Sequence, residues 1–102
     1  MTGRVVLCLC GDDRQHAMRR AVLEEAGFEV LTAASAEEAL DMTRFRRFAA
    51  LVVDPPGYQQ ISPRLRRLRE LAAGLPLVVA PVDTGKLRRM LDAIAPLQRR
   101  AA

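Results

Sequence analysis

Four short apolar runs recur along the chain, at residues 4–10, 28–33, 48–54 and 75–80. The first run, Arg-Val-Val-Leu-Cys-Leu-Cys, is continuous rather than alternating, which is typical of a strand buried on both faces of a parallel sheet. Each run is followed by a stretch with apolar residues at helical spacing. Four strand–helix repeats with short, right-handed connections predict an α/β protein, with a parallel sheet of four strands and four helices packed on both faces.

Capping residues mark the expected helix starts. Ser35 and Glu38 have the spacing of a capping box. Ser62 precedes Pro63, a pair expected at the beginning of a helix. By contrast, Pro-Pro-Gly at 55–57 predicts a loop directly after the third strand. The remaining signals are caps at Asp12 or Asp13 and at Asp83, and a left-handed helix stop at Gly27.

The apolar positions of the helices are expected to pack on the sheet. In the first helix, which should end near residue 26, these positions are Met18, Val22 and Leu23. The second helix, ending near residue 47, carries Phe45 among its apolar residues. The last helix has the longest stripe, which consists of Leu87, Met90, Leu91, Ile94 and Leu97.

Length and composition point to a single domain spanning residues 1–102. Half of the residues are hydrophobic and 27% are charged, which excludes a disordered chain. No apolar run approaches the roughly 18 residues that a membrane helix needs. The first residues lack the pattern of a secretion signal, so we expect a cytoplasmic protein.

Basic residues outnumber acidic ones, 16 to 12, and all of them except Lys86 are arginine. We interpret this first as the codon bias of a GC-rich genome. The alternative is a surface for nucleic acid or an acidic partner, built from the arginines of the helices that begin near residues 62 and 83. With 3 phenylalanines, 1 tyrosine and no tryptophan, the chain lacks a stacking platform, so nucleic acid is not the preferred partner.

Cys8 and Cys10 stand two residues apart in the first run. On a strand they share one face, at a spacing that disfavours a disulfide. His16 is the only other candidate zinc ligand, and three ligands of this kind are too few to predict a zinc site. We expect reduced, buried thiols.

Three carboxylates, Asp12, Asp13 and Asp54, follow two strands that should be neighbours in the sheet. Clustered acids need a compensating cation. A magnesium ion would supply it and would bring phosphate oxygens to a carboxylate nucleophile. The alternative is that Asp12 and Asp13 cap the first helix and that Asp54 caps a turn. Spacing alone leaves both interpretations open.

Four segments carry a family resemblance: Val-Val-Leu-Cys-Leu at 5–9, Glu-Glu-Ala-Gly-Phe-Glu-Val at 24–30, Ala-Ala-Ser-Ala-Glu-Glu-Ala-Leu at 33–40 and Leu-Val-Val-Asp at 51–54. Together they resemble the receiver domains of bacterial two-component response regulators. The resemblance implies a flavodoxin-like, three-layer α/β/α fold and a part in phosphorelay signalling. In typical members the aspartate that ends the third strand accepts the phosphoryl group, and Asp54 holds that position here.

The chain departs from the receiver pattern at several places. Cys10 and Gly11 stand where the family has its magnesium-binding acidic pair. Ala80 replaces the lysine of the family's Lys-Pro junction, and the run at 75–80 passes directly into the last helix. One strand and one helix of the family pattern, together with the switch hydroxyl, are therefore missing. A phosphoryl group on Asp54 would lack compensating cations, which predicts a degenerate receiver with impaired or absent phosphorylation.

The sequence thus favours a non-enzymatic signalling module that acts by protein–protein interaction and needs no cofactor. Its partner would be a histidine kinase, another regulator or a second copy, bound through the exposed edge of the last strand or through Leu87, Met90, Leu91 and Ile94. Two alternatives stay open. One is a phosphoacceptor that uses Asp54, with magnesium held by Asp12 or Asp13. The other is a small, arginine-rich nucleic-acid-binding protein.

Overall fold

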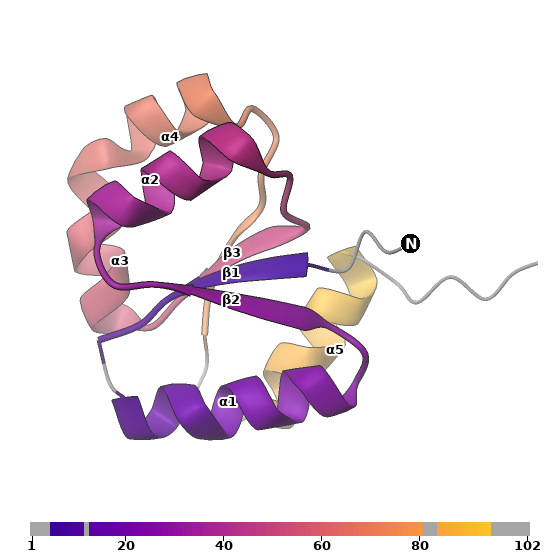
Figure 1. Ribbon diagram of the computed structural model, residues 1–102. Helices are drawn as coiled ribbons and strands as arrows, with labels where there is room; N and C mark the ends of the chain where they lie inside the picture. Colours follow the sequence, from indigo (N-terminus) through magenta and orange to yellow (C-terminus); the bar gives the residue numbers. More distant parts are fainter. Residues whose placement is uncertain (1–4, 12, 81–83, 95–102) are drawn as a thin grey trace, which may run out of the picture.

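The computed structural model describes residues 5–11, 13–80 and 84–94 (Figure 1). Its strands are β1 (Val5–Leu9), β2 (Glu29–Ala33), β3 (Ala50–Val53) and β4 (Leu77–Val79). Its helices are α1 (Asp13–Glu25), α2 (Ala36–Phe45), α3 (Pro55–Ile61), α4 (Leu65–Leu71) and α5 (Thr84–Ile94), with a 3-10 turn η1 (Ser62–Arg64) between α3 and α4.

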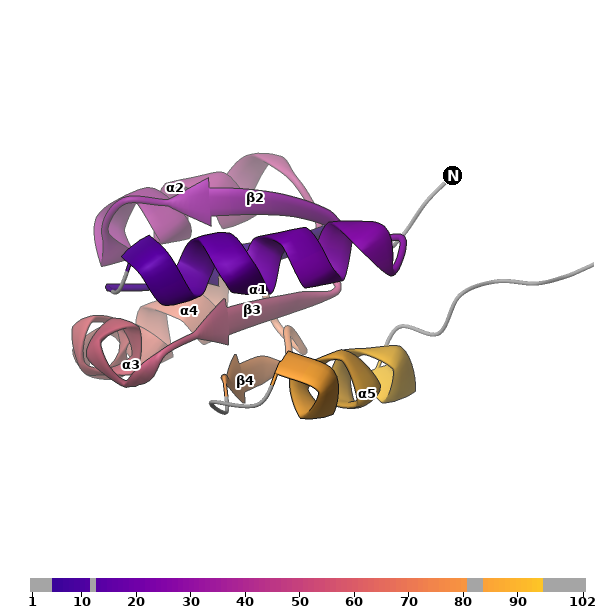
Figure 2. The same cartoon turned by 90° about the horizontal axis from the view of Figure 1, so that it is seen from below.

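Within these residues the strands form one sheet in the order β2-β1-β3-β4, and each neighbouring pair is parallel. Helices α1 and α5 cover one face, whereas α2, α3 and α4 cover the other (Figures 1 and 2). The predicted parallel, three-layer α/β/α architecture with four strands is confirmed. Between β3 and β4 the chain forms two short helices joined by η1, where the sequence predicted a loop and a single helix.

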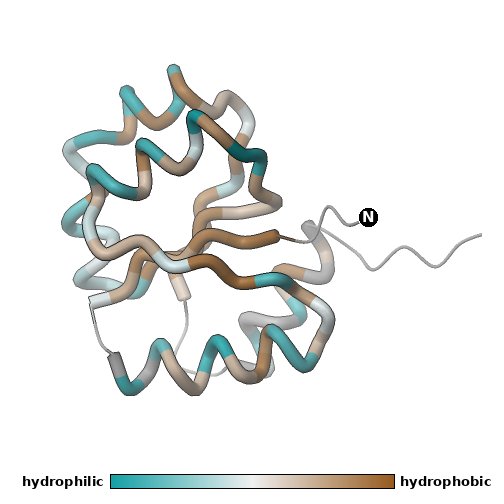
Figure 3. Tube along the Cα trace, viewed as in Figure 1, coloured by the Kyte–Doolittle hydropathy of each residue, from teal (hydrophilic) through white to brown (hydrophobic). Residues whose placement is uncertain are grey.

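The sheet separates two apolar cores, one on each face. In Figure 3 the central strand β1 is coloured as hydrophobic along its length. Every residue of β1 and β3 is buried, because these central strands are covered on both sides. This explains why their sequence runs are continuous. The core beneath α1 and α5 contains Val6, Cys8, Leu23, Phe28, Val30, Ala50, Val52, Val78, Ala80 and Leu91. The opposite core contains Leu7, Leu9, Ala33, Ala36, Ala39, Leu51, Val53, Ile61 and Leu68.

Helix α3 begins at the Pro-Pro-Gly sequence that was expected to form a loop, so this expectation was wrong. Proline is tolerated in the first helical turn because the N–H groups there have no partner within the helix. Ser62 was also expected to cap a helix. It lies instead in η1, whose own cap residue Ile61 makes no side-chain hydrogen bond, and α4 starts only at Leu65.

The capping box at the start of α2 is confirmed. The backbone N–H of Glu38 donates to Ser35 Oγ at 3.1 Å. The Glu38 carboxylate reaches back to the N–H of Ala34, at 2.6 Å, one residue before the position that the motif predicts. Gly27 ends α1 with a φ of 100°, as its expected left-handed stop requires.

Two apolar side chains expected in the core lie at the surface. Met18 is 62% exposed and Phe45 is 84% exposed. On α1 the predicted core residue Leu23 is buried, and a second inward position is taken by Arg19, which is only 3% exposed. Since Arg19 and Leu23 are four residues apart, they share one side of the helix, and this side differs from the one that carries Met18.

The apolar residues predicted to form one stripe on α5 differ in their burial. Leu91, which was expected at an interaction surface, is 1% exposed because it packs into the core with Val78 and Ala80, whereas Met90 is 39% exposed. The side chains of Leu87 and Ile94 lie outside the described residues. No helix in the described part of the chain is long and apolar enough to cross a membrane.

Candidate functional site

Two segments meet at the carboxyl ends of the central strands. Leu9 and Val53 are partners in the register of β1 and β3, so Cys10 and Asp54, which follow them, lie side by side. This is the edge at which parallel α/β sheets usually carry their sites. Of the residues predicted for a site, Asp54 is placed here. The side chains of Asp12 and Asp13 are outside the described residues.

The carboxylate of Asp54 is buried, and both of its oxygens accept backbone N–H groups. Gly11 donates its N–H to both carboxylate oxygens, at 3.0 Å to Oδ1 and 2.8 Å to Oδ2. Gly57 donates its N–H to Oδ1 at 2.7 Å, which makes Asp54 the N-cap of α3. Asp54 is only 3% exposed. The carboxylate therefore connects the end of β1 to the start of α3.

This enclosure depends on close backbone approaches. A Cβ atom on Gly57 would collide with the carbonyl oxygen of Leu9 and would lie 3.0 Å from Asp54 Oδ1. A Cβ atom on Gly11 would lie 2.8 Å from the Cβ of Pro56. Glycine at both positions lets the two segments close around the carboxylate.

Sequence reasoning missed the second charged group at this edge, Arg19 of α1. Its Nη1 donates to the sulfur of Cys10 at 3.5 Å. The Nε–H of the same guanidinium is buried and has no hydrogen-bond partner in the part of the chain that the structure describes. The signal that could have found it is its i,i+4 spacing to the core residue Leu23, which places Arg19 on the inner side of α1.

Neither cysteine forms a disulfide, and the pKa values of the two thiols are shifted in opposite directions. A hydrogen bond from the Cys8 side chain lowers the pKa of Cys10 below its usual value of 9.0, and the charge of Arg19 and a backbone hydrogen bond from Asp54 add to this, against the effects of burial and of the Asp54 charge. The same hydrogen bond, followed by burial, raises the pKa of Cys8 far above its usual range. Cys8 thus stays a protonated donor to Cys10.

The described residues do not form an evident magnesium site. No group of three or more His, Cys, Asp or Glu side chains among them is arranged to hold a metal ion. Both oxygens of Asp54 already accept N–H groups. The neighbouring Cys10 offers sulfur, whereas magnesium prefers oxygen ligands.

The position expected to carry the family's lysine also lies at this edge. Ala80 follows β4, is 7% exposed and donates its N–H to the carbonyl oxygen of Val53, the residue before Asp54. Its methyl group brings no charge to the carboxylate.

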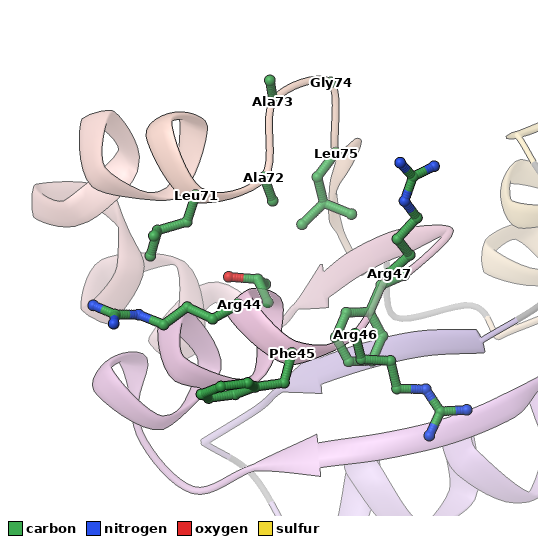
Figure 4. A pocket seen from close by; sticks show the side chains of 11 residues that line it. Arg44, Phe45, Arg46, Arg47, Leu71, Ala72, Ala73, Gly74 and Leu75 are labelled. Carbon is green, nitrogen blue, oxygen red and sulfur yellow. The ribbon is translucent and has the colours of Figure 1, made fainter.

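A cavity of about 600 Å³ lies between the ends of α2 and α4, away from Asp54, and is lined in part by Arg44, Phe45, Arg46 and Arg47 (Figure 4). Figure 4 shows the three arginine side chains pointing in different directions. Arg46 pairs with Glu29 at 3.1 Å. The arginines of this cavity therefore do not converge on one ligand.

The arginines expected to bind nucleic acid are partly engaged in ion pairs. Arg64 of η1 contacts Glu37 at 3.4 Å, and Arg67 of α4 contacts Glu70 at 3.5 Å. Both pairs are exposed to solvent, so each contributes little to stability.

No protein-family model and no curated protein sequence matches the chain. Solved structures do match it. The receiver domain of the hybrid histidine kinase CckA superimposes with a TM-score of 0.65 at 22% identity, covering 88% of this chain and 97% of that chain. An adenylate cyclase from Rhodopirellula baltica gives a TM-score of 0.73 at 16% identity, covering 91% and 87% of the two chains.

A third match is the receiver domain of the sensor histidine kinase PA1611 from Pseudomonas aeruginosa PAO1, which has a magnesium ion coordinated in its active site cleft. Its TM-score is 0.61 at 18% identity, covering 90% of this chain and 97% of that chain. The order β2-β1-β3, with Asp54 at the end of β3, agrees with the resemblance found in the sequence. The described part of the chain therefore has the fold of response regulator receiver domains.

Proposed function

We propose that the chain is a single receiver-like domain, residues 1–102, that works in the cytoplasm as a signalling module of a bacterial two-component system. It acts by binding a protein partner, and phosphorylation of Asp54 is impaired or absent. The fold supports the first part of this proposal. The observation that carries the second part is the enclosure of the Asp54 carboxylate by Gly11 and Gly57.

The enclosure opposes attack on a phosphodonor for a simple reason. Each oxygen of Asp54 already accepts at least one backbone N–H, and the residue is only 3% exposed, so an oxygen must become accessible before it can form a bond to phosphorus. The transferred group would also bring negative charge to this edge. The neighbouring Ala80 supplies no cation, and Arg19 points its guanidinium at Cys10. Positioned cations are the main source of catalysis in phosphoryl transfer.

The direct test is incubation of the full chain with acetyl phosphate and magnesium, followed by intact-protein mass spectrometry. Beryllofluoride with magnesium, monitored by backbone NMR, provides a second readout that requires no turnover. The Asp54→Asn variant is the matched control. We expect no modification of the wild-type chain. Stoichiometric phosphorylation that disappears in Asp54→Asn would overturn the inactive-receiver part of the proposal.

One observation favours a second candidate, a phosphoacceptor in which Asp12 or Asp13 holds magnesium. The PA1611 receiver, which has the same fold, coordinates a magnesium ion in its cleft. A magnesium titration discriminates between the two candidates. Saturable, millimolar shifts of the Gly11 and Asp54 amide resonances that are lost in Asp12→Asn or Asp13→Asn would favour the phosphoacceptor.

For the partner, we propose a protein surface that includes the free side of β4. Among the described strands this one has β3 alone beside it in the sheet, and its Val79 side chain is 46% exposed. Exposed strand edges commonly pair with another chain. On α5, Met90 is 39% exposed and is the second apolar residue that we propose for a partner, whereas Leu91 is buried and is not available. Sedimentation at increasing concentration tests self-association, and a monomer throughout would leave a different protein as the partner.

A further inference from the structure

Cys10 lies at the edge of the sheet with one accessible side and one side against a buried cation. It is partly exposed, whereas Arg19, which contacts its sulfur, is 3% exposed. We propose that Cys10 is an oxidation site that reacts with hydrogen peroxide to form a sulfenic acid, and that Arg19 is the residue that positions the oxidised sulfur.

The guanidinium of Arg19 is the observation that points to an oxygen-bearing group. Burying an arginine is unfavourable unless its donors find acceptors. Here the sulfur of Cys10, a weak acceptor, takes one N–H at 3.5 Å, and the buried Nε–H has no acceptor within residues 5–11, 13–80 and 84–94. A sulfenic acid or sulfenate on Cys10 adds an oxygen next to this guanidinium. Oxidation therefore supplies a strong acceptor to a cation whose hydrogen-bond acceptor among the described residues is a weak one.

The neighbouring carboxylate does not compete for this role. Asp54 lies beside Cys10, but its oxygens accept the N–H groups of Gly11 and Gly57. The Arg19 side chain is directed to Cys10 instead.

The two cysteines differ in a way that singles out one of them. Cys8 is 1% exposed and lies within the core under α1 and α5. A peroxide molecule can therefore reach Cys10 but not Cys8. The residues are two apart on one strand, where the separation of their Cα atoms disfavours a disulfide. Oxidation should stop at the sulfenic acid of Cys10 rather than proceed to a Cys8–Cys10 disulfide.

The step is a two-electron oxidation that needs only peroxide. A lone pair on the Cys10 sulfur attacks one peroxide oxygen, and an S–O bond forms as the O–O bond breaks. The departing hydroxide takes the thiol proton and leaves as water. The products are one Cys10 sulfenic acid and one water molecule, and a thiol such as dithiothreitol reverses the change.

This site goes beyond the proposed function and does not depend on it. The chemistry involves neither Asp54 as a nucleophile nor a protein partner. Its test reads covalent mass alone, so a failure here leaves the signalling proposal standing, and a failure of that proposal leaves this one standing.

The experiment exposes the full, reduced chain to stoichiometric hydrogen peroxide in the presence of dimedone, which traps sulfenic acids. Mass spectrometry of peptides then locates the adduct and gives its rate of formation. We expect the adduct on Cys10, no adduct on Cys8, and a rate about tenfold higher in the folded chain than in the chain unfolded by urea. The Cys8→Ala variant should still form the adduct, and Cys10→Ser should not.

Two variants test Arg19. Arg19→Met keeps the length and apolar stem of the side chain but removes its charge, and it should lower the rate about tenfold. Arg19→Lys restores a cation and should recover most of the rate, which a purely structural role of Arg19 would not predict. Circular dichroism shows whether each variant is folded.

Three outcomes would overturn the proposal. One is a folded chain that reacts no faster than the unfolded chain, a comparison that needs no variant. Another is an adduct on Cys8, or a disulfide in place of the adduct. The third is a folded Arg19→Met variant with the rate of the wild type.

Discussion

Gly11 donates a single backbone N–H to both carboxylate oxygens of Asp54, at 2.8 and 3.0 Å, across 43 residues of sequence. Together with the N–H of Gly57, this contact uses Asp54 as a buried anchor between two segments. A carboxylate in such a position stabilises the fold, whatever chemistry it performs. The predictions below begin with this anchor.

Replacing Asp54 should destabilise the chain. Asp54→Ala removes a helix cap and leaves the N–H groups of Gly11 and Gly57 without acceptors, so we expect the free energy of unfolding to fall by about 3 kcal/mol. Asp54→Asn keeps one acceptor oxygen and should cost about 1 kcal/mol. Urea denaturation followed by circular dichroism measures both. A loss below about 0.5 kcal/mol for Asp54→Ala would contradict the anchor.

Gly57→Ala should be more damaging than its single methyl group suggests. The new Cβ would collide with the backbone carbonyl of Leu9, and neither segment can move without disturbing the Asp54 carboxylate. We expect a loss of about 3 kcal/mol or failure to fold. Pro55→Ala, at the exposed first position of the same helix, is the matched control and should change stability by less than about 1 kcal/mol. Equal effects at the two positions would argue against the close approach.

The serines at 35 and 62 offer a paired test of helix capping. Ser35→Ala removes the acceptor for the N–H of Glu38 and should lower the free energy of unfolding by about 1 kcal/mol. Ser62→Ala should have almost no effect, because Ser62 lies in η1 and its side chain caps no helix. Thermal or urea unfolding of the two variants side by side measures the difference. A larger loss at Ser62 than at Ser35 would reverse the assignment.

Stability should fall at alkaline pH because of Cys8. Its hydrogen bond to Cys10 and its burial raise the folded-state pKa above the usual value of 9.0. Below that value both states keep the proton and the contribution is fully present. Above it the unfolded chain loses a proton that the folded chain retains, so the free energy of unfolding should decrease by about 1.4 kcal/mol per pH unit.

Urea titrations at a series of pH values check this slope, and Cys8→Ala is the control in which it should disappear. Cys10 contributes with the opposite sign, since its pKa is lowered, and its contribution is fully present only above pH 9.0. A wild-type chain and a Cys8→Ala variant with the same alkaline slope would contradict the prediction.

The strands could be predicted from sequence because burial on both faces leaves a continuous apolar run. This holds for β1 and β3, whose residues are all buried. The start of α3 could not be predicted in the same way. Pro-Pro-Gly breaks a helix in its interior, but here it is tolerated because it lies in a first turn that Asp54 caps.

The candidate site was predicted only in part. Asp54 was found because it ends an apolar run, and its neighbour Cys10 was recognised as a departure from the receiver pattern. Arg19 was missed because α1 has two partly apolar sides, and the sequence alone favoured the side with Met18. Which side faces the sheet is decided by packing against α5 and the core, which periodicity does not encode.

Gly11 directly follows Cys10, so the backbone at Cys10 is coupled to the contact that holds Asp54. Any change that displaces the backbone at Cys10 must also displace the N–H that holds Asp54, and Asp54 in turn fixes the first turn of α3. Oxygen added to one sulfur would thus be felt by a helix on the opposite face of the sheet. Under the proposed oxidation, a change at Cys10 would reach α3 without any phosphoryl group, through one carboxylate shared by two segments.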